Sequence, residues 1–166
     1  MITIKVRISK RDLERLQRFS SERRVKDVFH IKWPYRYYGF AKDRFDRFSR
    51  GGGDWPPLAE STKHGRRGHR YTVLRDTGLL FGALEFELGA EPPGQKTEKL
   101  AMGVRVGFGG PSSYPDGTSI ADIATFHQSG GPKLPKREII VQPNVETLNA
   151  MTNDLEGALQ EIADGR

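Results

Sequence analysis

The segment PYRYYGFAKDRFDRFSRGGG, residues 34–53, decides how the chain is organised. Its apolar side chains recur at spacings of three and four, which is typical of a helix that buries one face. They are Tyr35, Tyr38, Ala41, Phe45 and Phe48. Proline suits the first position of a helix, and glycine ends a helix because it accepts the left-handed conformation. The segment therefore predicts a helix over residues 34–50, beginning at Pro34 and ending at the three glycines.

Strands are predicted where apolar and polar residues alternate, namely at residues 2–8, 80–89, 98–108 and 137–142. The second and third are expected to form a hairpin, because a Pro- and Gly-containing turn separates them. A short helix is predicted over 119–128, and a longer one over 144–163, capped by Asn144 and acidic on its outer face. The pattern predicts an α+β fold: a curled antiparallel sheet packed by two main helices, with long Gly/Pro-rich loops.

Composition limits the class of protein. The chain has 166 residues, of which 36% are hydrophobic, with 19 Gly, 10 Pro and no Cys. We expect a single domain spanning 1–166, in which residues 1–32 form an N-terminal strand and a basic arm. No apolar run is long enough to cross a membrane, and the first residues lack the apolar stretch of a signal peptide. Folding in a cytoplasm is therefore expected.

Charge is distributed unevenly. Residues 1–75 hold 20 Lys and Arg against 8 Asp and Glu, a net of +12, whereas residues 76–166 hold 7 against 13, a net of −6. Three interpretations remain open: contact with nucleic-acid phosphates, head-to-tail docking of identical subunits, or a solvated surface that keeps the protein soluble. By charge, the best nucleic-acid candidate is the loop that contains Lys63, Arg66, Arg67 and Arg70.

Catalytic and metal-binding patterns are weak throughout. His64 and His69 lie among arginines, whose charge would repel a cation, and His127 is far away in the sequence. The glycine-rich segment 103–110 lacks the Lys and Ser/Thr of a phosphate-binding loop. Glu85 and Glu87 fit the solvated side of a strand better than an acid pair for glycoside hydrolysis. We therefore predict no enzyme activity, no metal and no cofactor.

Four segments, at residues 55–62, 74–80, 125–131 and 134–140, occur in an order that resembles the phage virion morphogenesis family, which includes the Mu-like tail completion proteins. Trp55, Pro57, Leu58 and Thr62 fill a Trp-x-Pro-Leu-x-x-x-Thr pattern that follows a helix and a glycine turn. The other three segments are Leu74–Leu80, similar to Leu-x-x-Thr-Gly-x-Leu; Thr125–Gly131, similar to His-Gln-x-Gly; and Leu134–Ile140, similar to Pro-x-Arg before an apolar strand. The likeness covers residues 45–163, within a core that spans 33–166. Ser129 stands where the family usually has an aromatic residue, and Glu138-Ile139 where it often has Pro-Phe.

This resemblance implies a structural protein of the tailed-phage neck, without catalytic residues. Such a protein is assembled in the host cytoplasm, becomes part of the virion, and forms a homo-oligomeric ring, expected to be a hexamer, at the head–tail junction. Its implied partners are other copies of itself, neighbouring neck and tail proteins, and packaged DNA in the channel. A stand-alone basic nucleic-acid-binding module is the alternative. A small enzyme using His127 is a weaker one.

Candidate interface residues follow from these segments: Trp55, Pro57, Leu58, His127 and Arg137. The Trp-Pro-Pro-Leu stretch either packs on the chain's own core or inserts into the next subunit. We expect Thr77-Gly78 to turn into the first hairpin strand. We also expect Arg137 to hold a carboxylate, on the acidic C-terminal helix, by a bidentate pair. The basic residues Lys63, Arg66, Arg67 and Arg70 would face the DNA channel or the acidic half of an adjacent subunit.

Overall fold

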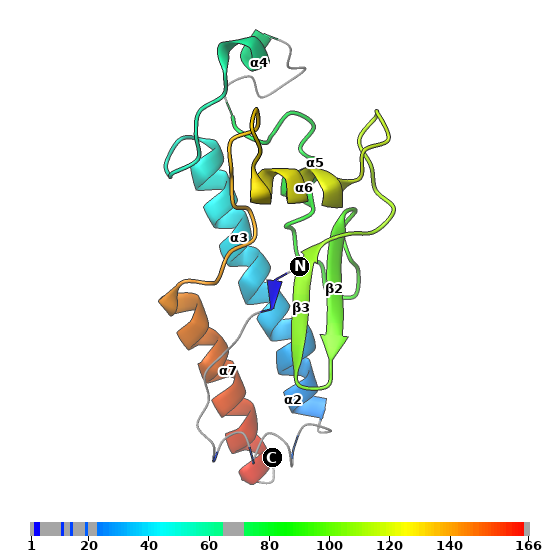
Figure 1. Ribbon diagram of the computed structural model, residues 1–166. Coiled ribbons are helices and arrows are strands. Elements are labelled where there is room, and N and C mark those ends of the chain that lie inside the picture. Colours follow the sequence, from blue (N-terminus) through cyan, green and yellow to red (C-terminus); the bar gives the residue numbers. More distant parts are fainter. Residues whose placement is uncertain are drawn as a thin grey trace. The chain divides into compact units, whose positions relative to one another are not determined.

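The computed structural model describes residues 2–3, 11, 14, 19, 23–64 and 72–164. The fold is α+β, as predicted: helices accompany an antiparallel sheet that does not close on itself (Figure 1). The sheet has the order β1 (Ile2–Thr3), β3 (Gly103–Phe108), β2 (Gln95–Leu100). The two long helices are α3 (Trp33–Ser49) and α7 (Val145–Ala163).

Two compact units are built from interleaved parts of the chain. Unit 1 comprises Met1–Tyr37, Thr97–Val106 and Gln142–Arg166. Unit 2 comprises Tyr38–Lys96 and Gly107–Val141. Helix α3 and the two hairpin strands therefore contribute residues to both units.

The helical segment that precedes α3 in unit 1 was not predicted. Helix α2 (Arg23–Asp27) continues through a π-helix, η1 (Val28–Lys32), into α3. The π-turn is marked by the backbone N–H of Trp33, which donates to the carbonyl of Val28, five residues back. Pro34 explains this widening, because a proline inside a helix has no N–H and crowds the preceding turn. The helix predicted over 34–50 is confirmed as α3, but Pro34 does not begin the helical segment, which already runs from Arg23.

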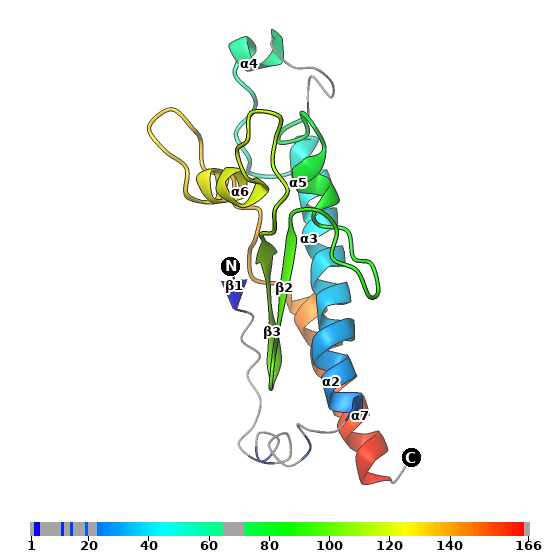
Figure 2. The ribbon, with the colours of Figure 1, turned by 90° about the vertical axis from the view of Figure 1, so that its right-hand side faces the viewer.

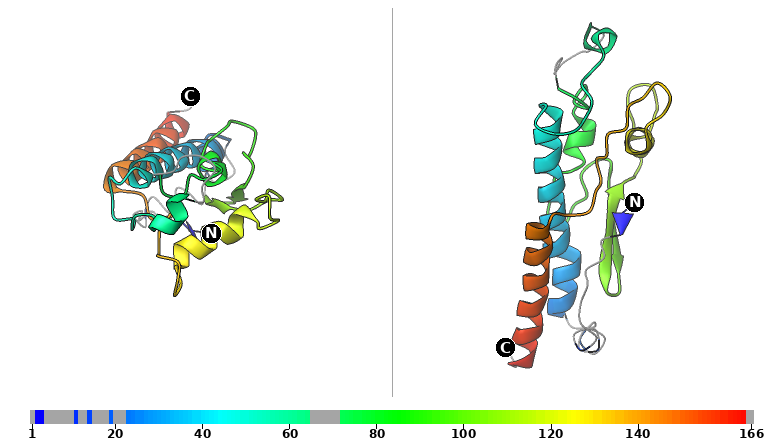
Figure 3. Two further views of the ribbon diagram at one scale, coloured as in Figure 1. Left: turned by 90° about the horizontal axis from the view of Figure 1, so that it is seen from above. Right: turned by 60° about the vertical axis from the view of Figure 1, so that its left-hand side comes forward.

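Helix α7 packs antiparallel to this segment within unit 1, as the right-hand view of Figure 3 shows. The indole N–H of Trp33 donates to the carbonyl of Met151 at 2.9 Å. Arg36 donates two hydrogen bonds to Asp154, and Arg24 lies 3.3 Å from Glu161. The predicted cap is confirmed, since the Asn144 side chain accepts from the N–H of Thr147.

The hairpin consists of β2 and β3, joined by a turn at residues 101–102 (Figure 2). Across it, Arg105 lies 3.1 Å from Glu98. Strand β1 pairs antiparallel with β3, with Ile2 opposite Val106 and Thr3 opposite Arg105. The predicted strand 2–8 is confirmed for residues 2–3, and residues 4–8 lie outside the described part.

The predicted hairpin partner at residues 80–89 was wrong, and the strand predicted over 98–108 is two strands. Residues 79–82 form a short helix, α5 (Leu79–Gly82), with turns after it. The side chain of Gln95, only 4% exposed, explains the difference. Its amide donates to the carbonyls of Ala83 at 3.0 Å and Glu85 at 2.6 Å, so a side chain binds the backbone where a strand was expected. The turn at Thr77-Gly78 consequently leads into α5, with Gly78 left-handed at φ 78°.

The predicted strand 137–142 was also wrong, because a side chain again takes the place of a neighbouring strand. The segment follows α6 (Ile120–Ser129), a helix predicted over 119–128 and capped by Ser119. Gln128 of α6 accepts from the N–H groups of Ile139 at 2.9 Å and Ile140 at 3.1 Å, and donates to the carbonyl of Ile140 at 2.8 Å. These hydrogen bonds hold the segment against the end of α6, where the described part of the chain shows no strand.

The predicted apolar stripe of α3 is confirmed in all but one position. Tyr38, Ala41, Phe45 and Phe48 are buried, whereas Tyr35 is 63% exposed. The face that turns inward includes Tyr37 instead, which is fully buried.

Candidate functional site

Trp55 is buried in its own unit, one of the two alternatives left open by the sequence. Its indole packs edge-on against Phe45 and Phe48, with ring centroids 5.1 and 5.7 Å away. The glycine turn makes this possible: Gly51 has a left-handed φ of 88°, and a Cβ at Gly53 would lie 2.1 Å from the Phe48 ring. Only glycine allows the chain to pass so close to Phe48 and return Trp55 to α3.

Arg137 fixes the loop that follows the tryptophan. The residue is 4% exposed, and its guanidinium donates to the carbonyl of Pro56 at 3.0 Å and to that of Pro57 at 3.3 Å. These hydrogen bonds lie within unit 2, and the expected contact with a carboxylate of α7 stays a prediction. Both proline rings are exposed, and Leu58 is half-buried.

His127 lies in the last turn of α6 and contributes through its backbone. Its carbonyl accepts a 2.7 Å hydrogen bond from the N–H of Arg137. Together with the Gln128 amide, this carbonyl binds the backbone of segment 137–140. The structure therefore brings together four of the five predicted interface residues, Trp55, Pro57, His127 and Arg137, with Leu58 next to them in sequence.

Arg44 completes this cluster and was not singled out by the sequence analysis. Its guanidinium lies 4.2 Å from the centroid of the Phe48 ring and donates to the carbonyl of Glu138 at 2.5 Å. The carboxylate of Glu138 pairs with Lys136 at 2.6 Å, and the hydrogen bond from that lysine lowers the pKa of Glu138. A cation above an aromatic ring is a stabilising contact that periodicity does not reveal.

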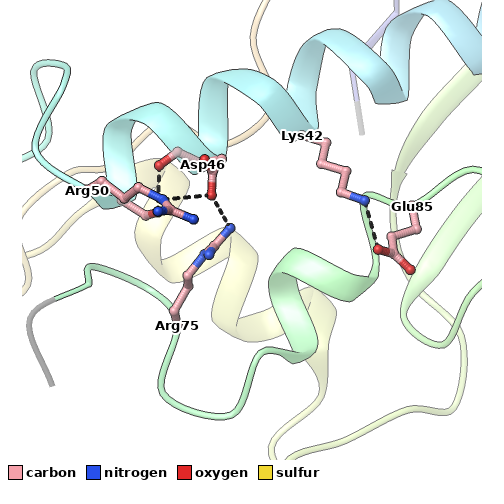
Figure 4. A network of polar contacts seen from close by, with 6 residues as sticks. Lys42, Asp46, Arg50, Arg75 and Glu85 are labelled. Carbon is pink, nitrogen blue, oxygen red and sulfur yellow. Dashed lines mark hydrogen bonds and ion pairs between the residues drawn. The ribbon is translucent and has the colours of Figure 1, made fainter. Parts of the chain in front are cut away.

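A second polar network anchors the chain after residue 71 (Figure 4). Asp46 accepts from Arg75 at 2.6 Å and from Arg50 at 3.1 Å, the latter four residues further along the chain. The Arg75 guanidinium also stacks on the Phe81 ring, with 3.8 Å to its centroid. Its side chain is only 11% exposed, so Arg75 serves the fold and is not available to a polyanion.

The basic loop is described only at its start. Lys63 belongs to α4 (Glu60–His64), a helix in which no residue is buried, and pairs with Glu60 at 2.5 Å. Arg66, Arg67 and Arg70 lie outside the described residues.

The two oppositely charged parts of the sequence are joined by ion pairs within the chain. Arg24–Glu161 and Arg36–Asp154 link them in unit 1, and Lys42–Glu85, at 2.7 Å, in unit 2. The charge asymmetry thus has an intramolecular use that the sequence analysis did not consider. Within the described residues, no group of three His, Cys, Asp or Glu could hold a metal ion, and no helix is both long and apolar enough to span a membrane.

Comparison of the chain with protein-family models, with curated proteins and with solved structures finds no match.

Proposed function

We propose that this chain is a structural component of a tailed-phage virion at the head–tail junction, where copies of it form a ring. Its residues then act by shaping and joining subunits, and none has a catalytic role.

One observation supports the proposal most: the segments that resemble the virion morphogenesis family are bound to one another. Arg137 bonds the carbonyls of Pro56 and Pro57, and its own N–H bonds the carbonyl of His127. The Thr77-Gly78 turn begins α5, whose Phe81 ring lies 5.7 Å from Phe45, the residue that also packs on Trp55. Shared residues that meet in one cluster are expected when a family preserves a scaffold.

The test is the composition of particles. Virions purified from a lysate of the source phage should contain the chain, detected by mass spectrometry, in a small fixed copy number per particle. Deletion of its gene should give filled heads and separate tails that do not join. If particles lacking the chain are complete and infectious, the proposal is wrong.

The nucleic-acid-binding alternative gives a different result with the purified protein. A basic module should bind duplex DNA with a log affinity that falls steeply with log salt, because Lys and Arg displace counterions from phosphates. A ring component that acts without binding DNA should give no steep dependence of DNA affinity on salt in this titration. The chain should nevertheless be present in purified virions.

A further inference from the structure

Helix α7 exposes a polar stripe along one face. Its buried side chains are Met151, Leu155, Ala158 and Leu159. The opposite face presents Asn149, Asn153, Gly157 and Gln160, which are all exposed and follow spacings of three and four. Among the described residues, the one side-chain hydrogen bond of Asn149, Asn153 and Gln160 joins Gln160 to Asp164, at the end of the same helix. This outer face of α7 has no described partner element.

Gly157 lies in the middle of that face, and no contact within the described chain requires a glycine at this position. A Cβ at this position would meet no atom within 4 Å. Glycine weakens a helix interior relative to alanine, so an unforced glycine there lowers stability. What glycine does offer is a bare backbone that another molecule can approach closely.

The charge around this stripe is negative. Helix α7 contains Glu146, Asp154, Glu156 and Glu161 and has no Lys or Arg. Asp154 and Glu161 are paired with arginines of the same chain. Glu146 and Glu156 are exposed, and no ion pair is recorded for either within the part of the chain that the structure describes. The free carboxylates therefore favour a cationic partner.

A face of matching character lies on the helical segment 26–35 of the same unit. Ile31 is 37% exposed and Tyr35 is 63% exposed, one helical turn apart. Lys26 and Lys32 are exposed beside them, with no ion pair recorded among the described residues. A face with a large apolar and a large aromatic side chain beside two ammonium groups complements a helix face that carries a glycine and two carboxylates.

We propose that the outer face of α7 in one copy of the chain packs against the 26–35 face of a second copy. Lys26 and Lys32 meet the carboxylates of Glu146 and Glu156, and the bare backbone at Gly157 leaves room for the Tyr35 side chain. Because the two faces differ, the contact is head-to-tail, and repetition closes a ring when the rotation between copies allows it. This inference deepens the proposed function and rests on its ring of identical subunits.

Charge reversal tests the pairing. By sedimentation equilibrium at low salt, Glu156→Lys and Lys32→Glu should each weaken self-association by at least about tenfold, because like charges then face each other. The double variant should recover most of the wild-type affinity. Glu87→Lys is the matched control, because it reverses an exposed carboxylate of unit 2 that has no recorded ion pair, and it should associate like the wild type.

Substitution of the glycine gives an independent readout. Gly157→Ala should raise Tm by about 2–4 °C through helix propensity and yet weaken self-association. Gly82→Ala, also without crowding at its Cβ, should leave association unchanged. If Glu156→Lys and Gly157→Ala associate like the wild type, the α7 contact is refuted while a ring formed through other surfaces still stands. If the wild type is monomeric up to about 1 mM, the contact is also refuted, whereas the proposed function is decided by the composition of particles.

Discussion

Gln128→Ala should destabilise the protein more than its half-buried position suggests. The side-chain amide makes three hydrogen bonds with the backbone of Ile139 and Ile140, at 2.8 to 3.1 Å. Both isoleucines are almost fully buried, at 1% and 7% exposure. Each buried backbone group left without a partner costs about 1–3 kcal/mol, so even at the lower limit the loss comes to roughly 3 kcal/mol. That is a large part of a domain stability of about 5–15 kcal/mol.

Urea unfolding followed by far-UV circular dichroism measures this loss as a lower midpoint at unchanged slope. Gln160→Ala is the control, because its amide bonds only Asp164 on the exposed end of α7. Gln128→Glu separates hydrogen bonding from volume: the carboxylate can still accept from the two N–H groups but cannot donate to the Ile140 carbonyl. If Gln128→Ala is no more destabilising than Gln160→Ala, the view that a side chain replaces a strand here is refuted.

Three further outcomes follow from the same contacts. Trp55→Ala should cost about 3–5 kcal/mol in the free energy of unfolding, against about 0.5 or less for Lys63→Ala; equal effects in thermal unfolding would contradict the packing of the indole. Gly53→Ala should destabilise strongly, because its Cβ would lie 2.1 Å from the Phe48 ring, and a wild-type Tm would refute that close approach. In an NMR titration, Lys136→Ala should raise the pKa of Glu138, because the lysine hydrogen bond lowers it in the wild type; an unchanged pKa would rule out this hydrogen bond as the cause.

Periodicity located the elements whose hydrogen bonds are local. Helices at 34–50, 119–128 and 144–163 were predicted close to their observed bounds, because a helix satisfies its backbone within the segment. The capping residue Asn144 was identified for the same reason: its contact with Thr147 lies three residues away.

Strand predictions failed where a distant glutamine side chain binds the backbone. Residues 84–88 alternate in sequence, yet Gln95 bonds the carbonyls of Ala83 and Glu85, and Gln128 bonds the backbone of residues 139–140. Alternation indicates which side chains tend to be buried. It does not show which group forms hydrogen bonds with the backbone N–H and C=O groups of the segment. The signal available in the sequence was a glutamine next to an apolar segment, which is too common to predict a specific contact.

Four of the five predicted interface residues lie in one cluster, although their place at a subunit interface stays a prediction. The resemblance selected Trp55, Pro57, His127 and Arg137, and these residues do meet. The hydrogen bonds from Arg137 to two proline carbonyls were not predicted, because no feature in the sequence marks these carbonyls as acceptors. Arg44 was missed because a cation–π contact depends on the three-dimensional position of the Phe48 ring.

The net charge constrains what an assembly of this chain must contact. Each ion pair within a chain, such as Arg24–Glu161, removes one charge of each sign and leaves the net value of +6 unchanged. A head-to-tail contact between copies has the same property, so a ring gains +6 with every copy it adds. Self-association can therefore use the acidic face of α7 and still leave the whole excess of positive charge to be screened. Contacts through exposed charges should weaken as salt shortens the Debye length to about 8 Å at physiological ionic strength, whereas packing by Trp55 and its aromatic neighbours should not. In the proposed ring, dissolved counterions, packaged DNA or an acidic partner protein must balance that remainder, because contacts between identical copies cannot reduce it.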